Sequence, residues 1–326
     1  MSAEGGSKAI VAALAANAGI AVAKFVGFLV TGSSSMLAES VHSVADTANQ
    51  GLLLLGQKQA KRAADRLHPF GFGRSRYFYS FVVALVLFTL GSVFALYEGI
   101  HKIGHPEPLS SPFVAVGVLV VAVGLEGYSF RTAVHESRPL KGTASWWQFV
   151  RTSRSPELPV VLLEDAGALV GLVLALAGVG LSVATGDPVW DGIGTVGIGL
   201  LLGVIATVLI VEMQSLLIGE GATAVEEAAI LQALVGGAIV RVIHCKTQYL
   251  GPDELMVAAK VAVPGQVSTA QLAATIDAAE LRVRTAVPAA GMIFLEPDLD
   301  RAEVDAASRS AKYGDQANTA SSGGTT

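Results

Sequence analysis

The chain has 326 residues, of which 52% are hydrophobic and only 15% carry a charged side chain. A soluble domain of this length carries about 25% charged residues, so the composition argues against a soluble globular protein and predicts a surface that faces lipid. The formal net charge is −5 without a basic tract, which argues against nucleic acid as a partner, and the single cysteine excludes an intrachain disulfide.

Six runs of residues approach the roughly 20 apolar residues that a membrane-spanning helix needs. The first run follows a short polar tail at 1–7 and is long enough to span, so we expect a first membrane helix and not a cleaved signal peptide. The second run is the least apolar. The expected spans are 8–30, 34–58, 77–100, 112–134, 157–184 and 189–218. Together they predict an α-helical membrane domain over residues 8–218.

Basic residues are concentrated in two of the connections between these runs. The connections after the first, third and fifth runs contain Lys102 as their one basic residue. The positive-inside rule therefore places both termini and the two basic connections in the cytoplasm, and the short loops favour the cell (plasma) membrane. The basic residues are Lys61, Arg62, Arg66, Arg74 and Arg76 after the second run, and Arg131, Arg138, Lys141, Arg151 and Arg154 after the fourth.

The composition changes after Gly221, where shorter elements replace the long apolar runs. Turn residues at Gly251-Pro252-Asp253 separate two short Val/Ile-containing runs, as in a hairpin. The order α-β-β-α-β predicts a small, ferredoxin-like α+β cytoplasmic domain over 219–304, followed by a disordered tail at 305–326. Its expected elements are helices at 222–236 and 268–286 and strands at 239–249, 254–263 and 291–296.

The second run carries a stripe of polar residues at helical spacing. Buried ionisable groups are costly in a membrane and persist mainly when they are paired or functional. His42 and Asp46 lie on adjacent turns, so both can bind one ion, and imidazole plus carboxylate suits zinc and related metals. A structural hydrogen-bonded pair and a proton relay remain alternatives. The stripe consists of Glu39, His42, Asp46, Asn49 and Gln50, the last two as polar lining.

The fifth run contains two adjacent acids, Glu164 and Asp165. Neighbouring helix positions differ by about 100°, so these two side chains cannot point at the same spot. We expect Asp165 to be the inward ligand and Glu164 to be its partner or a proton carrier. The alternative is that Glu164 pairs with an arginine on the cytoplasmic side.

These residues resemble the cation diffusion facilitator family. The resemblance covers about 8–298 and rests on His42-x-x-x-Asp46, the acid in the fifth run, and six spans followed by a small α/β domain. Two further stretches fit, His68-Pro69-Phe70-Gly71-Phe72-Gly73-Arg74 and Ser34-Ser35-Met36-Leu37-Ala38-Glu39. The Val161–Asp165 stretch and Trp146-Trp147 look like the branch with the mitochondrial zinc-transporter homologue.

The resemblance implies a metal-ion/proton antiporter and not an enzyme. Zinc is the most frequent cargo of the family, with cadmium, cobalt, iron and manganese as alternatives, and the expected form is a homodimer. Members bind the ion with two residues from helix two and two from helix five. Here these are His42, Asp46 and Asp165, whereas the fourth position is Val161. Water, Glu39 or Glu164 would then complete the site, and a carboxylate-rich site suits manganese.

Two other regions fit metal sites of the family less well. Asp65 and His68 match a second, loop site, although Phe72 stands where some members have a further histidine. The alternative there is a turn shaped by Pro69 and Gly71. In the C-terminal domain, His244 and Cys245 occupy adjacent strand positions and point to opposite faces, so that domain is expected to support dimerisation instead of binding metal.

The overall expectation is alternating access around a midplane site, with efflux of metal from the cytoplasm in exchange for protons. A channel would need a continuous polar path, whereas the polar groups cluster at one depth. An intramembrane enzyme would need a His-Glu-x-x-His helix or a serine nucleophile in a glycine-rich context. A membrane scaffold that does not transport remains the last alternative.

Overall fold

The computed structural model describes the chain apart from residues 1, 32–33, 107–111 and 301–326. The predicted disordered tail at 305–326 therefore lies outside the described residues. Some helical side chains, among them those of Glu39 and His42, also lie outside the description. The chain divides into two compact units, Met1–Gly219 with Gly251–Asp253, and Glu220–Leu250 with Glu254–Thr326.

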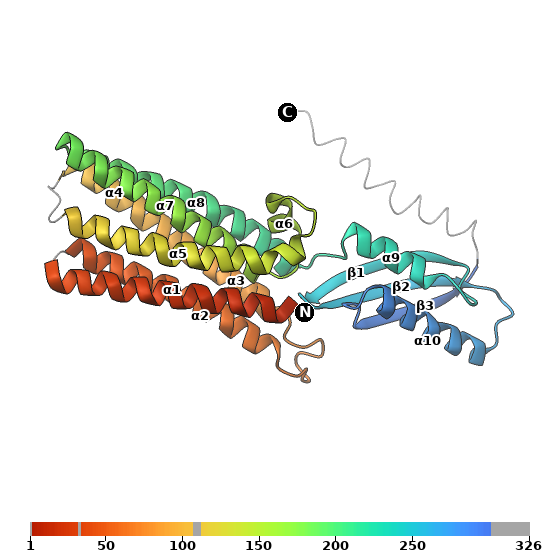
Figure 1. Cartoon of the computed structure of the whole chain (residues 1–326). Coiled ribbons are helices and arrows are strands. Elements are labelled where there is room, and N and C mark those ends of the chain that lie inside the picture. Colours follow the sequence, from red (N-terminus) through yellow and green to blue (C-terminus); the bar gives the residue numbers. More distant parts are fainter. Residues whose placement is uncertain (1, 32–33, 107–111, 301–326) are drawn as a thin grey trace, which may run out of the picture. The chain divides into compact units, whose positions relative to one another are not determined.

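The first unit is a bundle of long helices (Figure 1). Each of the six runs expected to span is helical, and the third is divided by a π-helical turn, η1. The elements are α1 (Ser2–Thr31), α2 (Ser34–Ala60), α3 (Ser75–Val86), η1 (Leu87–Val93), α4 (Phe94–Gly104), α5 (Pro112–Lys141), α6 (Trp146–Thr152), α7 (Glu157–Thr185) and α8 (Val189–Ile218).

Four segments in the described part of the chain are long and apolar enough to cross a membrane. They are Ser75–Gly104, Phe113–Lys141, Glu157–Thr185 and Val189–Ile218. Helices α1 and α2 have 30 and 27 residues, which is sufficient length, but α2 carries the polar stripe. The protein is thus a multi-pass membrane protein, and the number six stays a prediction.

The helices differ from the predicted ones most clearly at three places. Helix α1 begins at Ser2 and not at residue 8, because the small residues before Lys8 continue the helix. Helix α5 continues to Lys141, so Arg131 and Arg138 belong to the helix and not to the following connection. Helix α6, which was not predicted, begins after Ser145, whose side chain accepts a hydrogen bond from the backbone nitrogen of Gln148 at 3.1 Å.

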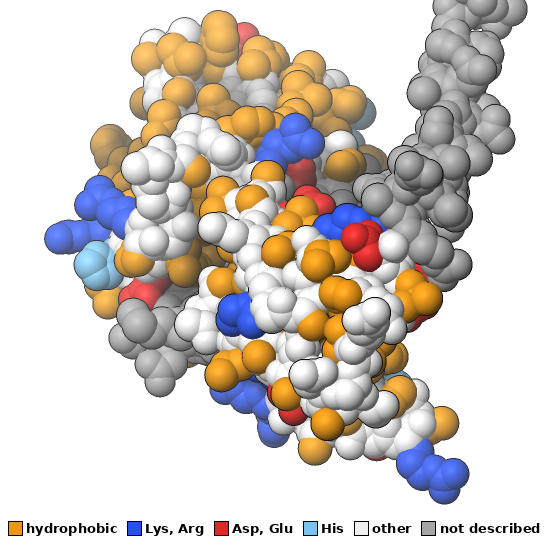
Figure 2. Space-filling model, turned by 90° about the vertical axis from the view of Figure 1, so that its right-hand side faces the viewer, with side chains coloured by type: hydrophobic (Ala, Val, Ile, Leu, Met, Phe, Trp, Pro, Cys, Tyr) orange, Lys and Arg blue, Asp and Glu red, His pale blue; other side chains and the backbone are white. Residues whose placement is uncertain are grey.

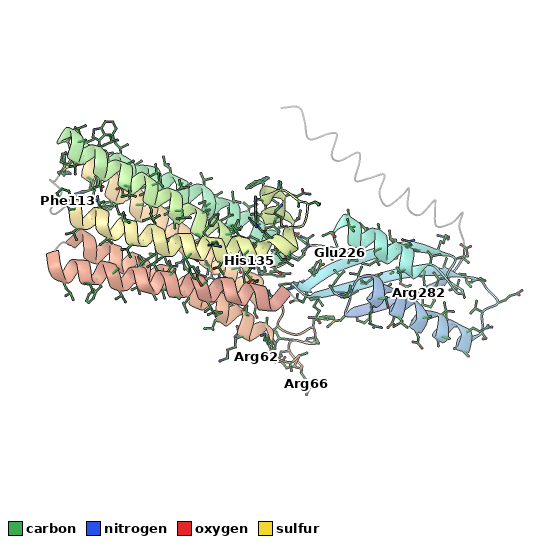
Figure 3. All side chains as sticks on the ribbon, in the orientation of Figure 1. Arg62, Arg66, Phe113, His135, Glu226 and Arg282 are labelled. Atoms are coloured by element: carbon green, nitrogen blue, oxygen red, sulfur yellow. The ribbon has the colours of Figure 1, made fainter. Side chains whose placement is uncertain are left out.

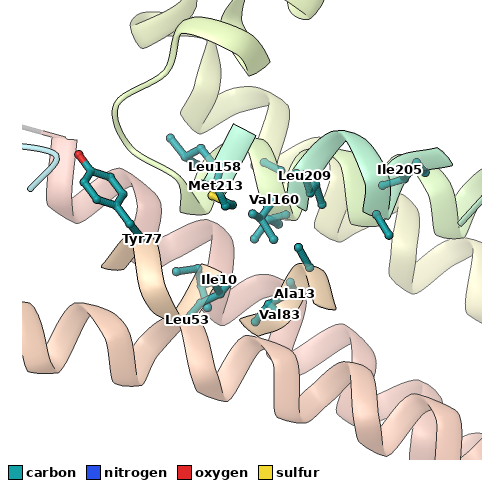
Figure 4. Packing of buried hydrophobic residues seen from close by; sticks show 14 of the residues in the cluster. Ile10, Ala13, Leu53, Tyr77, Val83, Leu158, Val160, Ile205, Leu209 and Met213 are labelled. Carbon is teal, nitrogen blue, oxygen red and sulfur yellow. The ribbon is translucent and has the colours of Figure 1, made fainter. Parts of the chain in front are cut away.

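Apolar side chains from seven helices, α1, α2, α3, α5, α6, α7 and α8, form the core of the bundle, part of which is seen in Figure 4. Each of these helices turns one apolar face inward and so removes it from water or lipid headgroups. Fully buried members are Ile10 of α1, Leu53 of α2, Val83 of α3, Val160 of α7 and Leu209 of α8. This core lies beside the polar residues of α2 and α7 and fixes the positions of their backbones.

Glycines allow α4 and α8 to approach very closely. A Cβ atom on Gly99 would lie 2.7 Å from the backbone nitrogen of Val196, and one on Gly199 would lie 2.8 Å from the backbone nitrogen of Leu96. Small residues of this kind permit backbone contact between membrane helices. The glycines of α4 and α8 therefore hold these two helices together.

The second unit has the predicted order of elements: α9 (Ala224–Leu234), β1 (Arg241–Gly251), β2 (Glu254–Val263), α10 (Thr269–Ala286) and β3 (Met292–Leu299). The strand order is β1-β2-β3, and β2 and β3 are parallel. Both helices begin with a capping box, at Thr223 and Ser268. The ferredoxin-like assignment stays a prediction.

A separate apolar core lies within the second unit. Ile230 of α9 and Val283 of α10 are fully buried, as are Leu255 and Val257 of β2. On the face shown in Figure 2, charged side chains of both signs are scattered among apolar and uncharged ones. The unit thus has a hydrophobic core of its own.

Candidate metal centre in the helical unit

The polar stripe of α2 faces the interior of the bundle where it is described. Asn49 and Gln50 are buried, with exposed fractions of 2% and 0%, and Asp46 is half-buried. Glu39 and His42 belong to the same helix, but their side chains lie outside the described residues. The described half of the stripe therefore has the inward orientation that the spacing predicts.

The two adjacent acids of α7 are buried and point to different helices. Gln50 Nε2 of α2 donates a hydrogen bond to Glu164 Oε2 at 2.8 Å. Ser129 Oγ of α5 donates one to Asp165 Oδ2 at 2.6 Å. The predicted divergence of the two side chains is present. It is Glu164 that meets the stripe of α2, whereas we expected Asp165 to be the inward residue.

Carboxyl groups from three helices lie within electrostatic range of Glu164. Asp46, Glu126 and Asp165 all lie close enough to Glu164 to interact with it electrostatically. Glu126 belongs to α5 and is 7% exposed. Like charges repel strongly away from water, so a proton or a bound cation would stabilise these acids.

Three buried oxygen atoms beside these acids have no hydrogen-bond partner among the described residues. They are Asn49 Oδ1, Gln50 Oε1 and Glu164 Oε1. A buried acceptor without a partner costs about 1–3 kcal/mol. A cation or a water molecule among them would remove this cost, and oxygen ligands suit the harder divalent metals.

Part of the predicted ligand set lies outside the described residues. Within them, no three histidine, cysteine, aspartate or glutamate side chains are grouped as a metal ion requires. His42 and Glu39, two of the predicted ligands, are outside that set. Val161 is fully buried in the apolar core. The fourth position of the family pattern is therefore taken by a core residue and not by a metal ligand.

An arginine does pair with an acid of α7, but the acid is not Glu164. Arg76 Nε and Nη2 donate to the two carboxylate oxygens of Glu157 at 2.5 and 2.9 Å, and both residues are buried. Arg76 Nη1 also donates to Asp253 at 3.0 Å. The alternative that Glu164 takes an arginine partner is wrong in this structure, because Glu157 at the first turn of α7 takes that arginine and Glu164 contacts Gln50.

The loop after α2 brings Asp65 and His68 together. Asp65 Oδ1 accepts hydrogen bonds from the backbone nitrogens of Leu67 and His68 and contacts His68 Nδ1 at 3.1 Å. The hydrogen bond from the His68 backbone lowers the pKa of Asp65. Phe72 packs on the His68 ring with centroids 4.4 Å apart. One oxygen of Asp65 is thus engaged in shaping the loop, and the loop metal site stays a prediction.

Glu126 and Ser129 were not identified from the sequence. Glu126 lies alone in the apolar run of α5, and an ionisable residue inside a membrane helix is by itself a functional candidate. That criterion singled out Glu164 and applied equally to Glu126. Ser129 has no such signal, because a serine is common in membrane helices and its partner Asp165 is on another helix.

His244 and Cys245 lie on opposite faces of the second unit's sheet. Cys245 packs against the apolar core, and burial raises the pKa of its thiol to about 11. His244 is exposed and lines a small cavity with Lys246, Phe294 and Glu296. The pair therefore does not form a joint metal site.

Long apolar helices define the first unit as a membrane domain, and two of them, α5 and α7, carry buried acids in its interior. The family model of the cation efflux transmembrane domain matches residues 10–218. The chain therefore belongs to the cation efflux, or cation diffusion facilitator, family.

Related proteins agree with this membership. The chain is 36% and 34% identical over 270 residues to the mitochondrial proton-coupled zinc antiporters SLC30A9 of Xenopus laevis and Mus musculus, covering 82% of this chain and 48% and 47% of those proteins. It is 31% identical to metal tolerance protein C4 of Arabidopsis thaliana over 264 residues, 79% of this chain and 57% of that protein. The chain thus spans about half the length of these relatives.

Proposed function

We propose that the protein is a secondary transporter that moves divalent metal cations across a membrane in exchange for protons, with zinc as the first candidate cargo. The observation that carries this proposal is the convergence of Asp46, Glu164 and Asp165 inside the bundle beside buried oxygens without partners. The names of the relatives, zinc antiporter and metal tolerance protein, support the choice of cargo.

Exchange with protons follows from the chemistry of these ligands. Carboxylates and imidazole bind a metal ion in their deprotonated forms, so protons compete with the metal for the same atoms. In this proposal His42 and Asp46 of α2 act with Asp165 of α7, and Glu164 or Glu39 completes the set. A change in helix packing opens the occupied site first to one side of the membrane and then to the other.

We further propose that both termini lie on the side of the basic loops. Arg62 and Arg66 lie in the loop after α2, at the opposite end of the helical unit from Phe113 (Figure 3). Metal would enter from that side. The zinc antiporters SLC30A9 are named as mitochondrial proteins, so these relatives give no support to the plasma membrane as the location. Association as a homodimer through the second unit remains part of the proposal.

Manganese is the second candidate cargo. The candidate metal-ligand atoms that the structure describes at the cluster are oxygen atoms of carboxyl, amide and hydroxyl groups. Oxygen donors favour harder ions such as Mn²⁺ over Zn²⁺, whereas an imidazole favours Zn²⁺. The side chain of His42 therefore decides between the two metals.

Transport into proteoliposomes tests the proposal. Zinc and manganese uptake would be followed with metal indicators, and the counter-flow of protons with a pH indicator in the lumen. We expect Asp46→Ala and Asp165→Ala to abolish both signals, because each removes an oxygen ligand and one charge from the site. Glu98→Ala is the matched control, since Glu98 is an acid of α4, which packs on α8.

Full uptake of both metals by Asp46→Ala and Asp165→Ala would contradict the proposed site. Metal uptake in the wild-type protein without any proton movement would contradict the antiport. If well-folded wild-type protein took up no divalent metal, the proposed transport would be contradicted, and the alternative of a membrane scaffold that does not transport would be favoured.

A further inference from the structure

We propose that α5 is a third wall of the metal site, in which Glu126 contacts the transported cation and Ser129 positions Asp165. This inference rests on the proposed function and adds a helix to it. The expected ligands come from α2 and α7 alone. Glu126 of α5 extends that set, and Ser129 of α5 orients one of its members.

The hydroxyl of Ser129 fixes one oxygen of Asp165. The two atoms, Ser129 Oγ and Asp165 Oδ2, are 2.6 Å apart, and the residues are 0% and 1% exposed. A hydrogen bond between a hydroxyl and a charged group is short and stronger than a neutral one. Ser129 therefore holds the carboxylate of Asp165 in one orientation and leaves its second oxygen for a ligand.

Glu126 lies on the same face of α5 as Ser129, because the two are three residues apart. It is buried, and it interacts electrostatically with Glu164. Helices α5 and α7 run in opposite directions (Figure 1). Glu126 is thus one turn beyond Asp165 on the side away from Val161. Helix α5 therefore adds the carboxylate of Glu126 at one end of the cluster. Val161, which stands in place of the family's fourth ligand, is at the other end.

The surroundings of Glu164 identify the ligand as a cation. Among the described residues, the groups that interact with it electrostatically are acids, namely Asp46, Glu126 and Asp165. Independently, Gln50 Oε1 and Glu164 Oε1 are buried without hydrogen-bond partners in the described structure, at residues that are 0% and 6% exposed. Gln50 directs its amide at Glu164 through Nε2, so its free oxygen lies beside the same carboxylate. Acceptor oxygens without donors, together with clustered carboxylates, fit a divalent cation.

The test uses the full chain, with ZnCl₂ and MnCl₂ as separate probes. Initial uptake rates into proteoliposomes would be measured against metal concentration for the wild type, Glu126→Gln, Glu126→Asp, Ser129→Ala and Ser129→Thr. Glu136→Gln is the matched control, because Glu136 lies on α5 three turns nearer its C-terminal end. The same variants would be melted in detergent with and without metal, because a ligand that binds the folded state raises the melting temperature.

We expect Glu126→Gln to raise the KM for Mn²⁺ about 10–100-fold, and the KM for Zn²⁺ less, because it replaces a charged oxygen ligand. Ser129→Ala is expected to raise KM about 10-fold for both metals, as loss of a group that orients a ligand does, and Ser129→Thr to restore it. For Glu126, a structural role alone would shift melting temperatures without changing the ratio of Mn²⁺ to Zn²⁺ KM values. For Ser129, a structural role alone would lower the melting temperature without raising KM.

Wild-type KM values in Glu126→Gln and Ser129→Ala, with Asp165→Ala inactive, would overturn this inference and leave the proposed function standing. Normal uptake by Asp165→Ala would overturn the proposed function itself. Where Glu126→Gln does not fold, Glu126→Asp decides. A retained carboxylate with an altered Mn²⁺ to Zn²⁺ ratio supports the contact, and an unaltered ratio overturns it.

Discussion

Glu164 and Asp165 are neighbours in α7, but they are held by different helices. Gln50 of α2 binds the first, and Ser129 of α5 binds the second. Because adjacent positions are about 100° apart on a helix, a pair of acids can connect one helix to two others. This arrangement makes α7 the helix through which changes at the site would reach both of its neighbours.

The single cysteine offers a prediction at the scale of one residue. Burial raises the pKa of Cys245 to about 11, against about 8.5 for a free thiol. The reactive species is the thiolate. At pH 8 we therefore expect iodoacetamide to label the folded protein roughly a hundredfold more slowly than the unfolded protein.

The pH profile checks this prediction. Labelling of the folded protein should keep rising about tenfold per pH unit through pH 9 and 10, because its thiol is still protonated there. The urea-unfolded protein, the control, should level off above about pH 9. A plateau at the same pH in both states would show that the thiol of Cys245 is not shifted.

Residue types and their spacing predicted part of the site. The inward orientation of Asn49 and Gln50 and the divergence of Glu164 and Asp165 follow from helix geometry and could be foreseen. The Ser129–Asp165 hydrogen bond could not, because it joins residues on two helices whose relative rotation is set by packing. Glu126 was missed although its position in an apolar run signalled it.

At the scale of helices, the close approach of α4 and α8 depends on glycine. Gly99→Ala would place a Cβ atom 2.7 Å from the backbone nitrogen of Val196, so the two helices must separate. We expect a loss of about 1–3 kcal/mol in the free energy of unfolding, as overpacking causes. Thermal unfolding in detergent would show it as a lower melting temperature.

Gly124→Ala is the control for this substitution. Gly124 is also within a membrane helix, α5, but no described atom beyond its chain neighbours and the adjacent helix backbone lies within 4 Å of the position that its Cβ would occupy. That variant should be neutral or slightly more stable, because alanine favours a helix over glycine by about 1 kcal/mol. Equal melting temperatures for the two variants would show that the α4–α8 contact is not as close as described.

Helix boundaries were predicted well where hydrophobicity changes abruptly and poorly where it does not. The first residues of α7 and α8 match the prediction because prolines precede them. The end of α5 was placed too early, because its last turns carry charged residues and resemble a loop in composition. The same effect hid α6, a short helix in a basic connection.

At the scale of the molecule, the chain consists of two units with separate cores. The second buries residues of α9, α10 and β2 against one another, and Arg241 Nε donates to Asp300 at 2.9 Å near its end. We therefore expect a fragment of residues 220–300 to fold without the membrane helices. Circular dichroism in urea should give one cooperative transition.

The fragment also has an internal control. Val257→Asp would bury an unpaired charge in its core, which costs several kcal/mol, and should abolish the transition. A wild-type fragment that unfolds without cooperativity would contradict the independence of the second unit. The order of its five elements was predictable from turn residues and alternation, whereas the parallel pairing of β2 with β3 is a tertiary feature.

The π-helical turn η1 affects how the third span tolerates a change of length. A π-turn has i→i+5 hydrogen bonds and so contains more residues than an α-turn. Loss of one residue within Leu87–Val93 would let the segment close into a regular α-helix, while α3 and α4 keep the sides that they present to their neighbours. The same deletion in α8 would rotate all following residues by about 100°. Among related chains, insertions and deletions in this membrane helix should therefore concentrate at η1.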